Sequence, residues 1–310
     1  MSVRRKLTVG TRGSRLALRQ TELLVAALRA RHRALEIDVR EIRTEGDRRT
    51  GESLLAIGGQ GVFVKEIEAA LLRREIDFAV HSLKDVPADL AGGCLIAAIP
   101  QRADPRDSLV TRDGARLAGL PSGARIGTGS ARRAVQLRAL RSDIEPVDIR
   151  GNVETRIRKV DEGQFDGAVL AVAGLERLGL RAHASQIFEP AELLPAVGQG
   201  ALAVEARADD AEVLEVLAAI DDRDARLSVE AERAFLRRLG GGCRLPFGAL
   251  AEIDGETLRI RGFISDATGE RAFRDELRGA ANDAQTLGTQ LAERLLEDGA
   301  IEFVDVGEAT

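Results

Sequence analysis

The chain has 310 residues, of which 44% are hydrophobic and 31% are charged, enough for one large or two to three ordinary domains with buried cores. Its 45 basic and 50 acidic side chains give a formal net charge of -5, which argues against a general nucleic-acid-binding protein. The longest apolar stretch, residues 167–175, is far shorter than the roughly 20 residues of a membrane-spanning helix. Neither nucleic acid nor a membrane is therefore an expected partner.

Cysteine and histidine are few and scattered. The chain contains Cys94 and Cys243, without a C-x-x-C pair, and three histidines. This pattern disfavours a disulfide framework or a zinc site, so no metal is expected. The basic N-terminal residues are followed by polar residues and not by the apolar region and cleavage site of a secretion signal. A cytoplasmic location is expected.

Strand and helix patterns alternate from the N-terminus, as in α/β proteins. The expected elements are a strand at 7–9, a helix with apolar residues from 16 to 28, a helix at 64–71 and a strand at 78–80. The loop HSLKDVP, residues 81–87, follows the last of these strands. Loops at the carboxyl ends of strands are where α/β proteins bind ligands.

A second set of alternations begins near Asp107. It predicts strands at 108–110, 125–126, 147–149 and 167–172, with helices at 131–140 and 153–160. Residues 197–207 read as another strand, which could return to either domain. If it pairs in the first, two segments connect the domains and they can hinge.

The pattern changes again near residue 221. A long helix ends at 240–242, strands at 249–253 and 258–264 flank an Asp-Gly turn that favours a hairpin, and a helix covers 284–296. These elements predict a small α+β domain. The expected domains are thus 1–103 with 197–220, then 104–196, then 221–310.

Basic side chains are concentrated between residues 125 and 159, with nine basic against four acidic. For most of them a solvated helix face is the usual interpretation. Arg132 and Arg133 differ because they follow IGTGS, a strand-to-helix turn whose backbone N–H groups attract anions, and Arg150 follows a strand. No Phe, Tyr or Trp lies in this segment to stack on single-stranded nucleic acid. Small ligands with carboxylates or phosphates fit better.

Two further loops carry charge at strand ends. Lys84 and Asp85 are adjacent in HSLKDVP, and residues 11–14 follow the first strand. Taken alone, the pair at 84 and 85 is more often an exposed ion pair beside a turn. Three basic loops at three strand ends together favour a site for anionic ligands.

Cys243 has an unusual setting, with three glycines before it and Arg244 after it. Glycines free the backbone and a neighbouring cation favours the thiolate, as a tethering or nucleophilic thiol requires. No histidine is near it in sequence, which favours tethering, although distant residues could still approach. Cys94 lies in the apolar run CLIAAI and is expected to be an inert buried thiol.

The chain carries, in this order, TRGSRLALRQ, HSLKDVP, GTGSARR, RGNVETR, AVAGLERLG, GQGALAVEAR and GGCRLPFG. With these motifs it resembles the porphobilinogen deaminase family, the hydroxymethylbilane synthases, over almost its whole length. The resemblance implies two α/β domains similar to type II periplasmic binding proteins and a small α+β C-terminal domain. It also implies a dipyrromethane cofactor, bound through a thioether to Cys243. The implied reaction joins four porphobilinogen molecules head to tail with loss of ammonia, and hydrolysis then releases 1-hydroxymethylbilane.

The resemblance assigns roles residue by residue. Asp85 matches the catalytic aspartate, which stabilises successive cations and shuttles protons. The positions matching cofactor-binding residues, besides Cys243, are Lys84, Thr128, Ser130, Arg132 and Arg133. Those matching substrate-binding residues are Arg12, Ser14, Gln20, Phe63, Arg150, Arg156, Arg177 and Gln199. Each pyrrole carries an acetate and a propionate, so several cationic groups are expected around the growing chain.

The sequence departs from the family pattern at a few positions. Gln60 stands where many relatives have lysine, which removes one cation, and Gly129 and Ala131 replace a common serine and leucine. Two alternatives remain. A non-enzymatic hinged module that binds small polycarboxylates explains the arginines but not Cys243 in a third domain. A cysteine-dependent hydrolase or transferase would need a histidine near Cys243 in the fold. The expected state is a monomer whose partner is the small-molecule substrate.

Overall fold

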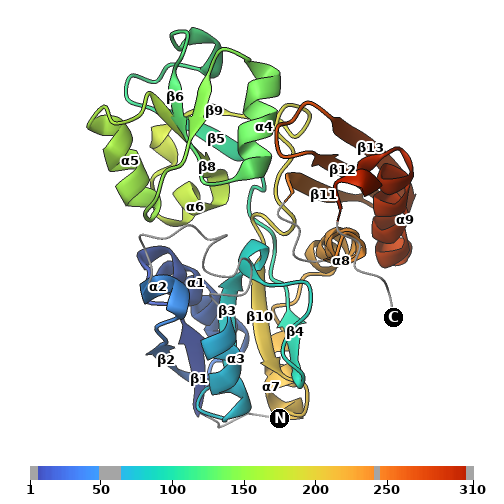
Figure 1. Cartoon of the computed structure of the whole chain (residues 1–310). Coiled ribbons are helices and arrows are strands. Elements are labelled where there is room, and N and C mark those ends of the chain that lie inside the picture. The colour runs from blue at the N-terminus through green and yellow to red at the C-terminus, as the bar shows by residue number, and fades with distance from the viewer. Residues whose placement is uncertain (1–5, 49–63, 241–244, 305–310) are drawn as a thin grey trace. The chain divides into compact units, whose positions relative to one another are not determined.

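The computed structural model describes residues 6–48, 64–240 and 245–304 (Figure 1). The chain divides into two compact units. One contains residues 1–102 and 201–226, and the other contains residues 103–200 and 227–310. The chain therefore passes from one unit to the other three times. In the parts of the chain that the structure describes, no helix is long and apolar enough to cross a membrane.

The first unit is built on a five-stranded sheet. Its strands are β1 (Lys6–Thr11), β2 (Glu36–Glu41), β3 (Phe78–Ser82), β4 (Cys94–Ala98) and β10 (Leu202–Arg207), in the order β2-β1-β3-β10-β4. Only β10 runs antiparallel to its neighbours. The helices are α1 (Arg15–Arg31), α2 (Glu45–Arg48), α3 (Lys65–Leu72) and α7 (Ala211–Ala218), and η1 (Leu83–Asp85) is a single 3-10 turn.

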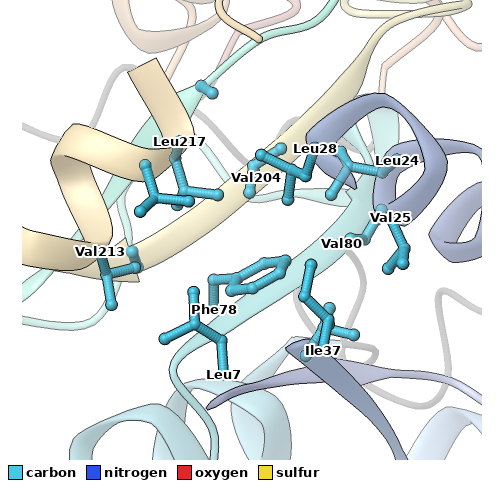
Figure 2. Packing of buried hydrophobic residues seen from close by; sticks show 14 of the residues in the cluster. Leu7, Leu24, Val25, Leu28, Ile37, Phe78, Val80, Val204, Val213 and Leu217 are labelled. Atoms are coloured by element: carbon cyan, nitrogen blue, oxygen red, sulfur yellow. The ribbon is translucent and has the colours of Figure 1, made fainter. Parts of the chain in front are cut away.

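Strand β3 is buried on both faces. On one face Phe78 packs in a cluster with Leu28 of α1 and Val213 of α7, as Figure 2 shows. On the other face Ala79 packs with Ile67 of α3. Burial on both faces explains why β3 reads as a continuous apolar run and not as an alternating one.

The second unit contains a sheet of the same topology. Its strands are β5 (Asp107–Thr111), β6 (Arg125–Gly127), β7 (Glu145–Val147), β8 (Gly167–Ala171) and β9 (Ala184–Ile187), in the order β7-β6-β8-β5-β9. Here β5 is the strand antiparallel to its neighbours. The helices are α4 (Ala131–Leu140), α5 (Val153–Asp161) and α6 (Val172–Arg177), with 3-10 turns η2 (Leu117–Gly119) and η3 (Arg181–His183).

The second unit also contains a small C-terminal sheet. Strands β11 (Phe247–Asp254), β12 (Thr257–Ser265) and β13 (Ala272–Ala280) are antiparallel, and α8 (Arg223–Arg238), α9 (Ala284–Glu297), η4 (Ala281–Asp283) and η5 (Ala300–Glu302) complete it. Gly262 permits close packing, because an added Cβ would lie 2.9 Å from the ring of Phe235. Within the unit, Val135 of α4 packs in one cluster with Leu250 and Phe263 of this sheet.

The predicted fold class is confirmed: two α/β sheets with a shared topology and a small α+β C-terminal domain. The strand expected at 197–207 begins only at Leu202, and it pairs in the first sheet. The strand expected at 147–149 lies at Glu145–Val147, and the one at 167–172 ends where α6 begins. The expected turn between β11 and β12 is present, with Gly255 at φ +59°. The domain boundaries and the hinge stay predictions.

Candidate active site

The first unit holds a pocket at the carboxyl ends of the parallel strands β1 and β3. Arg12 and Ser14 reach it from the turn after β1, Gln20 from α1, and Asp85 from the turn after β3. The lining residues are Arg12, Ser14, Leu16, Ala17, Gln20, Val64, Val80, His81, Ser82 and Asp85. The two loops that the sequence singled out in this unit therefore meet at one site.

Asp85 lies on the 3-10 turn that leaves the end of β3. Leu83 anchors this turn, because its side chain is buried and its backbone N–H donates to the carbonyl of Ala201 (3.1 Å). The half-buried carboxylate of Asp85 lines the pocket and forms no hydrogen bond or ion pair with any side chain in the described parts of the chain. Lys84 is half-buried on the same turn. Asp85 thus offers a carboxylate to a ligand.

Arg12 is held in place by Asp47. Its Nε and Nη2 donate to Oδ1 of Asp47 at 3.1 and 2.5 Å. Burial acts to raise the pKa of Asp47, but the hydrogen bonds and charge of Arg12 outweigh it and lower this pKa below its usual value. The ionised partner keeps the guanidinium of Arg12 at the pocket wall.

Two other predicted residues in this pocket make local hydrogen bonds. Nε2 of Gln20 donates to Oγ of Ser82 (2.9 Å), which ties α1 to the end of β3. Oγ of Ser14 accepts from the backbone N–H of Ala17 (3.2 Å) and caps α1. Ser14 therefore has a structural function as well as its place in the pocket.

His81 is a pocket residue to which sequence reasoning assigned no function. It is the fourth residue of β3, and its Nε2 lies 2.9 Å from Oε2 of Glu205 on β10. Both side chains are buried, at 4% and 1% exposure. The polar residues of HSLKDVP and GQGALAVEAR could have indicated that these two strands contribute polar side chains to a site.

Cys94 lies beside the same buried acids. Burial and the nearby carboxylates of Glu205 and Glu68 raise the pKa of its thiol to about 12. Burial and Glu205 also raise the pKa of Glu68, although Glu68 accepts a hydrogen bond from the backbone N–H of Ala91. Cys94 was expected to be buried but is half-buried, and these shifts still support the interpretation of an unreactive thiol.

The second unit gathers polar residues at the carboxyl ends of its parallel strands. Thr128 and Ser130 follow β6, and the N–H of Ser130 donates to Oγ1 of Thr128 (3.2 Å). Ser130 is the N-cap of α4, yet its hydroxyl makes no capping hydrogen bond. The N-terminus of α4 therefore suits an anion that accepts hydrogen bonds from this hydroxyl and from backbone N–H groups.

Three predicted substrate arginines lie on the loops and helices at this edge. Nε of Arg150 donates to Oδ2 of Asp148 (2.9 Å), and Nε of Arg156 donates to the carbonyl of Gly151 (2.8 Å). Nη2 of Arg177 donates to the carbonyl of Gly200 (2.7 Å). Burial lowers the pKa of Arg177 to about 10, so it stays cationic at neutral pH.

Arg132 and Arg133 are almost fully buried, at 5% and 6% exposure. Both pair with the fully buried carboxylate of Asp107, at 2.8 Å from Nη2 of Arg132 and 2.6 Å from Nη2 of Arg133. Nε2 of Gln199 donates to the same carboxylate at 2.8 Å. The sequence predicted neither the burial of these arginines nor their pairing with Asp107. The only available signal was an acid at the start of the expected strand at 108–110.

The structure thus collects the predicted residues into two sets, one in each unit. Cys243, Phe63 and Gln60 lie outside the described residues. Across residues 6–48, 64–240 and 245–304, no group of three or more His, Cys, Asp or Glu side chains could hold a metal ion.

Family models cover most of the chain. Residues 7–215 match the model described as porphobilinogen deaminase, dipyromethane cofactor binding domain, and residues 226–297 match porphobilinogen deaminase, C-terminal domain. The porphobilinogen deaminase of Roseiflexus sp. (strain RS-1) is 53% identical over 297 residues, which are 96% of this chain and 98% of that protein. The porphobilinogen deaminase of Syntrophobacter fumaroxidans is 48% identical over 301 residues, 97% of each chain.

Solved structures also match the chain, with low TM-scores and low sequence identity. A YaeC-family lipoprotein from Enterococcus faecalis V583 matches with a TM-score of 0.41 and 16% identity, covering 74% of this chain and 96% of that one. A periplasmic binding protein of Salmonella typhimurium matches with a TM-score of 0.36 and 15% identity, covering 70% and 92%.

Proposed function

Because the chain belongs to the porphobilinogen deaminase family, we propose that Asp85 is its catalytic residue and that the two sets of polar residues hold its carboxylate-bearing ligands. The chain is an enzyme of porphyrin biosynthesis, a hydroxymethylbilane synthase with a dipyrromethane cofactor. It joins four porphobilinogen molecules head to tail with loss of ammonia and then releases 1-hydroxymethylbilane by hydrolysis. The observation that carries the proposed site is the carboxylate of Asp85, which has no side-chain partner among the described residues, in a pocket that also contains Arg12.

Asp85 stabilises the positive charge that forms on the substrate in each condensation and accepts the ring proton that is then released. The C–N bond of the substrate's aminomethyl group breaks with ammonia as the leaving group, which leaves a positive charge on the substrate. A fixed carboxylate beside that carbon stabilises the charge, because it needs no reorganisation at the moment of reaction. When the new C–C bond forms, a ring proton is displaced, and Asp85 is placed to accept it.

The arginines bind the acetate and propionate groups of the substrate. Arg12, oriented by Asp47, acts from the first unit with Ser14 and Gln20. From the second unit the substrate residues are Arg150, Arg156, Arg177 and Gln199, and Phe63 completes the predicted set. Guanidinium groups suit this task because their parallel N–H donors match a carboxylate.

The residues at the edge of the second sheet fit the cofactor's carboxylates. The hydroxyl of Ser130 is not used in capping α4, and Nε of Arg132 is a buried donor that finds no acceptor among the described residues. Two arginines against one aspartate also leave one net positive charge. We assign Thr128, Ser130, Arg132 and Arg133 to the cofactor, with Lys84 from the first unit and a thioether to Cys243. When bound, the cofactor supplies the pyrrole carbon to which the first substrate is joined.

A mass measurement tests this assignment. The wild-type protein is expected to be heavier than its sequence by two linked pyrrole units and to give colour with Ehrlich's reagent. Cys243→Ser should abolish both signals, whereas Cys94→Ala should keep both. An unmodified but active wild type would contradict the proposal. The cytoplasmic location and the monomeric state also stay predictions, and light scattering on the eluting protein tests the second.

A further inference from the structure

Four hydrogen bonds from three side chains converge on the carboxylate of Asp107. Oδ1 accepts from Nε and Nη2 of Arg133 at 3.1 and 2.6 Å and from Nε2 of Gln199 at 2.8 Å. Oδ2 accepts from Nη2 of Arg132 at 2.8 Å. One carboxylate therefore holds three side chains at once, with both of its oxygens engaged.

The position of Asp107 places this cluster at the ligand edge of the second sheet. Asp107 is the first residue of β5 and lies opposite Ala171, the last residue of β8. The site residues that follow β6 and β8 leave the sheet at the same edge. The carboxylate is 0% exposed, so it can act only through the residues that it binds.

Each of the three partners has a second anchor that fixes its direction. Nη1 of Arg133 donates to the carbonyl of Val169 (2.9 Å), and Nε2 of Gln199 donates to the carbonyl of Pro105 (2.7 Å). Nη1 of Arg132 donates to the carbonyl of Leu194. With Asp107 as the common acceptor, the two guanidinium groups lie side by side despite their like charges.

We propose that Asp107 is a positioning residue for cofactor binding, which holds Arg132 and Arg133 in the one arrangement that accepts a carboxylate of the dipyrromethane. Without it, the two guanidinium groups repel each other and lose their common acceptor. The cluster then no longer offers a fixed net positive charge at the edge of the sheet. This inference rests on the proposed function, and it adds a residue that touches neither cofactor nor substrate.

The first test is Asp107→Asn, which keeps the shape of the side chain and removes its charge. The matched control is Asp113→Asn, because Asp113 lies just beyond the other end of β5 and its carboxylate caps an exposed turn. We expect the Asp107→Asn protein to fold but to carry at least roughly tenfold less bound pyrrole than wild type, because hydrogen bonds to charged groups are lost. Pyrrole per chain is measured with Ehrlich's reagent and intact mass, and folding by circular dichroism. A folded, fully loaded Asp107→Asn protein would overturn the proposal.

If Asp107→Asn does not fold, a second measurement tests the proposal. Nε–H signals of Arg132 and Arg133, assigned with single lysine variants, are compared by NMR between loaded wild type and Cys243→Ser. We expect the Arg132 signal to shift between the two proteins, and identical signals for both arginines would overturn the proposal. Wild type without added pyrrole mass would contradict the proposed function itself. Loaded wild type with fully loaded Asp107→Asn contradicts only the positioning role of Asp107.

Discussion

His81, which lines the pocket of Asp85, forms a buried pair with Glu205, with 2.9 Å between Nε2 and Oε2. The pair connects β3 to β10 close to the point where the turn of Asp85 leaves β3. Oε1 of Glu205 has no hydrogen-bond partner within the described residues. His81 therefore orients the carboxylate of Glu205, and Glu205 in turn orients the ring of His81.

The pair predicts a large stability effect of a single substitution. Glu205→Ala leaves His81 buried without its partner, and leaving a buried polar group unsatisfied costs about 1–3 kcal/mol. We expect a corresponding fall in the free energy of unfolding, measured by urea denaturation of the cofactor-free Cys243→Ser background. Glu215→Ala, on the exposed face of α7, is the control and should change stability by less than about 0.5 kcal/mol. Equal stability of both variants would contradict the importance of the pair.

Asp85 is expected to be needed for its charge and not for folding. Asp85→Asn keeps the shape but removes the charge that stabilises each cation, so kcat should fall by ~10²-fold or more. Asp85→Glu keeps the charge at a shifted position and should retain more activity. The assay is consumption of porphobilinogen by protein with confirmed cofactor mass. Asp89→Asn, exposed and four residues further along, should behave as wild type, and an equally active Asp85→Asn would exclude the proposed charge role.

The raised pKa of Cys94 predicts slow alkylation. With a pKa of about 12 in place of the ordinary 9, the thiolate fraction at pH 8.5 is lower by about 10³-fold, and alkylation requires the thiolate. In Cys243→Ser, where Cys94 is the only cysteine, iodoacetamide should leave the native protein unlabelled. The same protein in urea should gain one label. Rapid labelling of native protein, followed by mass spectrometry, would show that Cys94 does not lie beside the buried carboxylates of Glu205 and Glu68.

The sequence predicted the elements with strong patterns and missed those that depend on partners. Helix α4 was expected at 131–140, where it lies, because its apolar spacing is a local pattern. Strand β13 was missed, since three consecutive charged residues, 274–276, interrupt any alternating pattern in this edge strand of a three-stranded sheet. Strand β10 was expected to begin at residue 197, but Gly198 and Gly200 have positive φ angles of +71° and +88°, which end extended structure before Ala201.

The candidate site likewise has features that could be predicted from the sequence and features that could not. The loops of Arg12 and Asp85 could be predicted to meet, because both follow parallel strands and ligands bind at that edge. The burial of Arg132 and Arg133 could not, because it depends on Asp107, which is 25 residues away in sequence from Arg132. No local sequence pattern indicates which acidic residue a buried arginine will pair with.

The arginines are expected to separate into two classes by the step at which they act. A cation that holds the cofactor is needed before turnover begins, so Arg132→Leu and Arg133→Leu should yield largely cofactor-free protein. A cation that holds substrate is needed in every round. Arg12→Leu and Arg150→Leu should therefore keep the cofactor but stall with partial pyrrole chains. Intact-mass spectrometry before and after mixing with porphobilinogen distinguishes the two classes.

Lysine replacements and one control sharpen this prediction. Lysine at position 12 or 150 keeps the charge but not the parallel pair of donors, so it should rescue turnover only in part. Lysine at 133 cannot reproduce the hydrogen bonds to both Asp107 and Val169, so it should rescue cofactor loading poorly. Arg158→Leu, on the exposed face of α5 with only a 3.7 Å ion pair to Glu162, should load and turn over as wild type does. If the leucine variants at 12, 132, 133 and 150 all did the same, the basic cluster would be a solvated surface and not a carboxylate site.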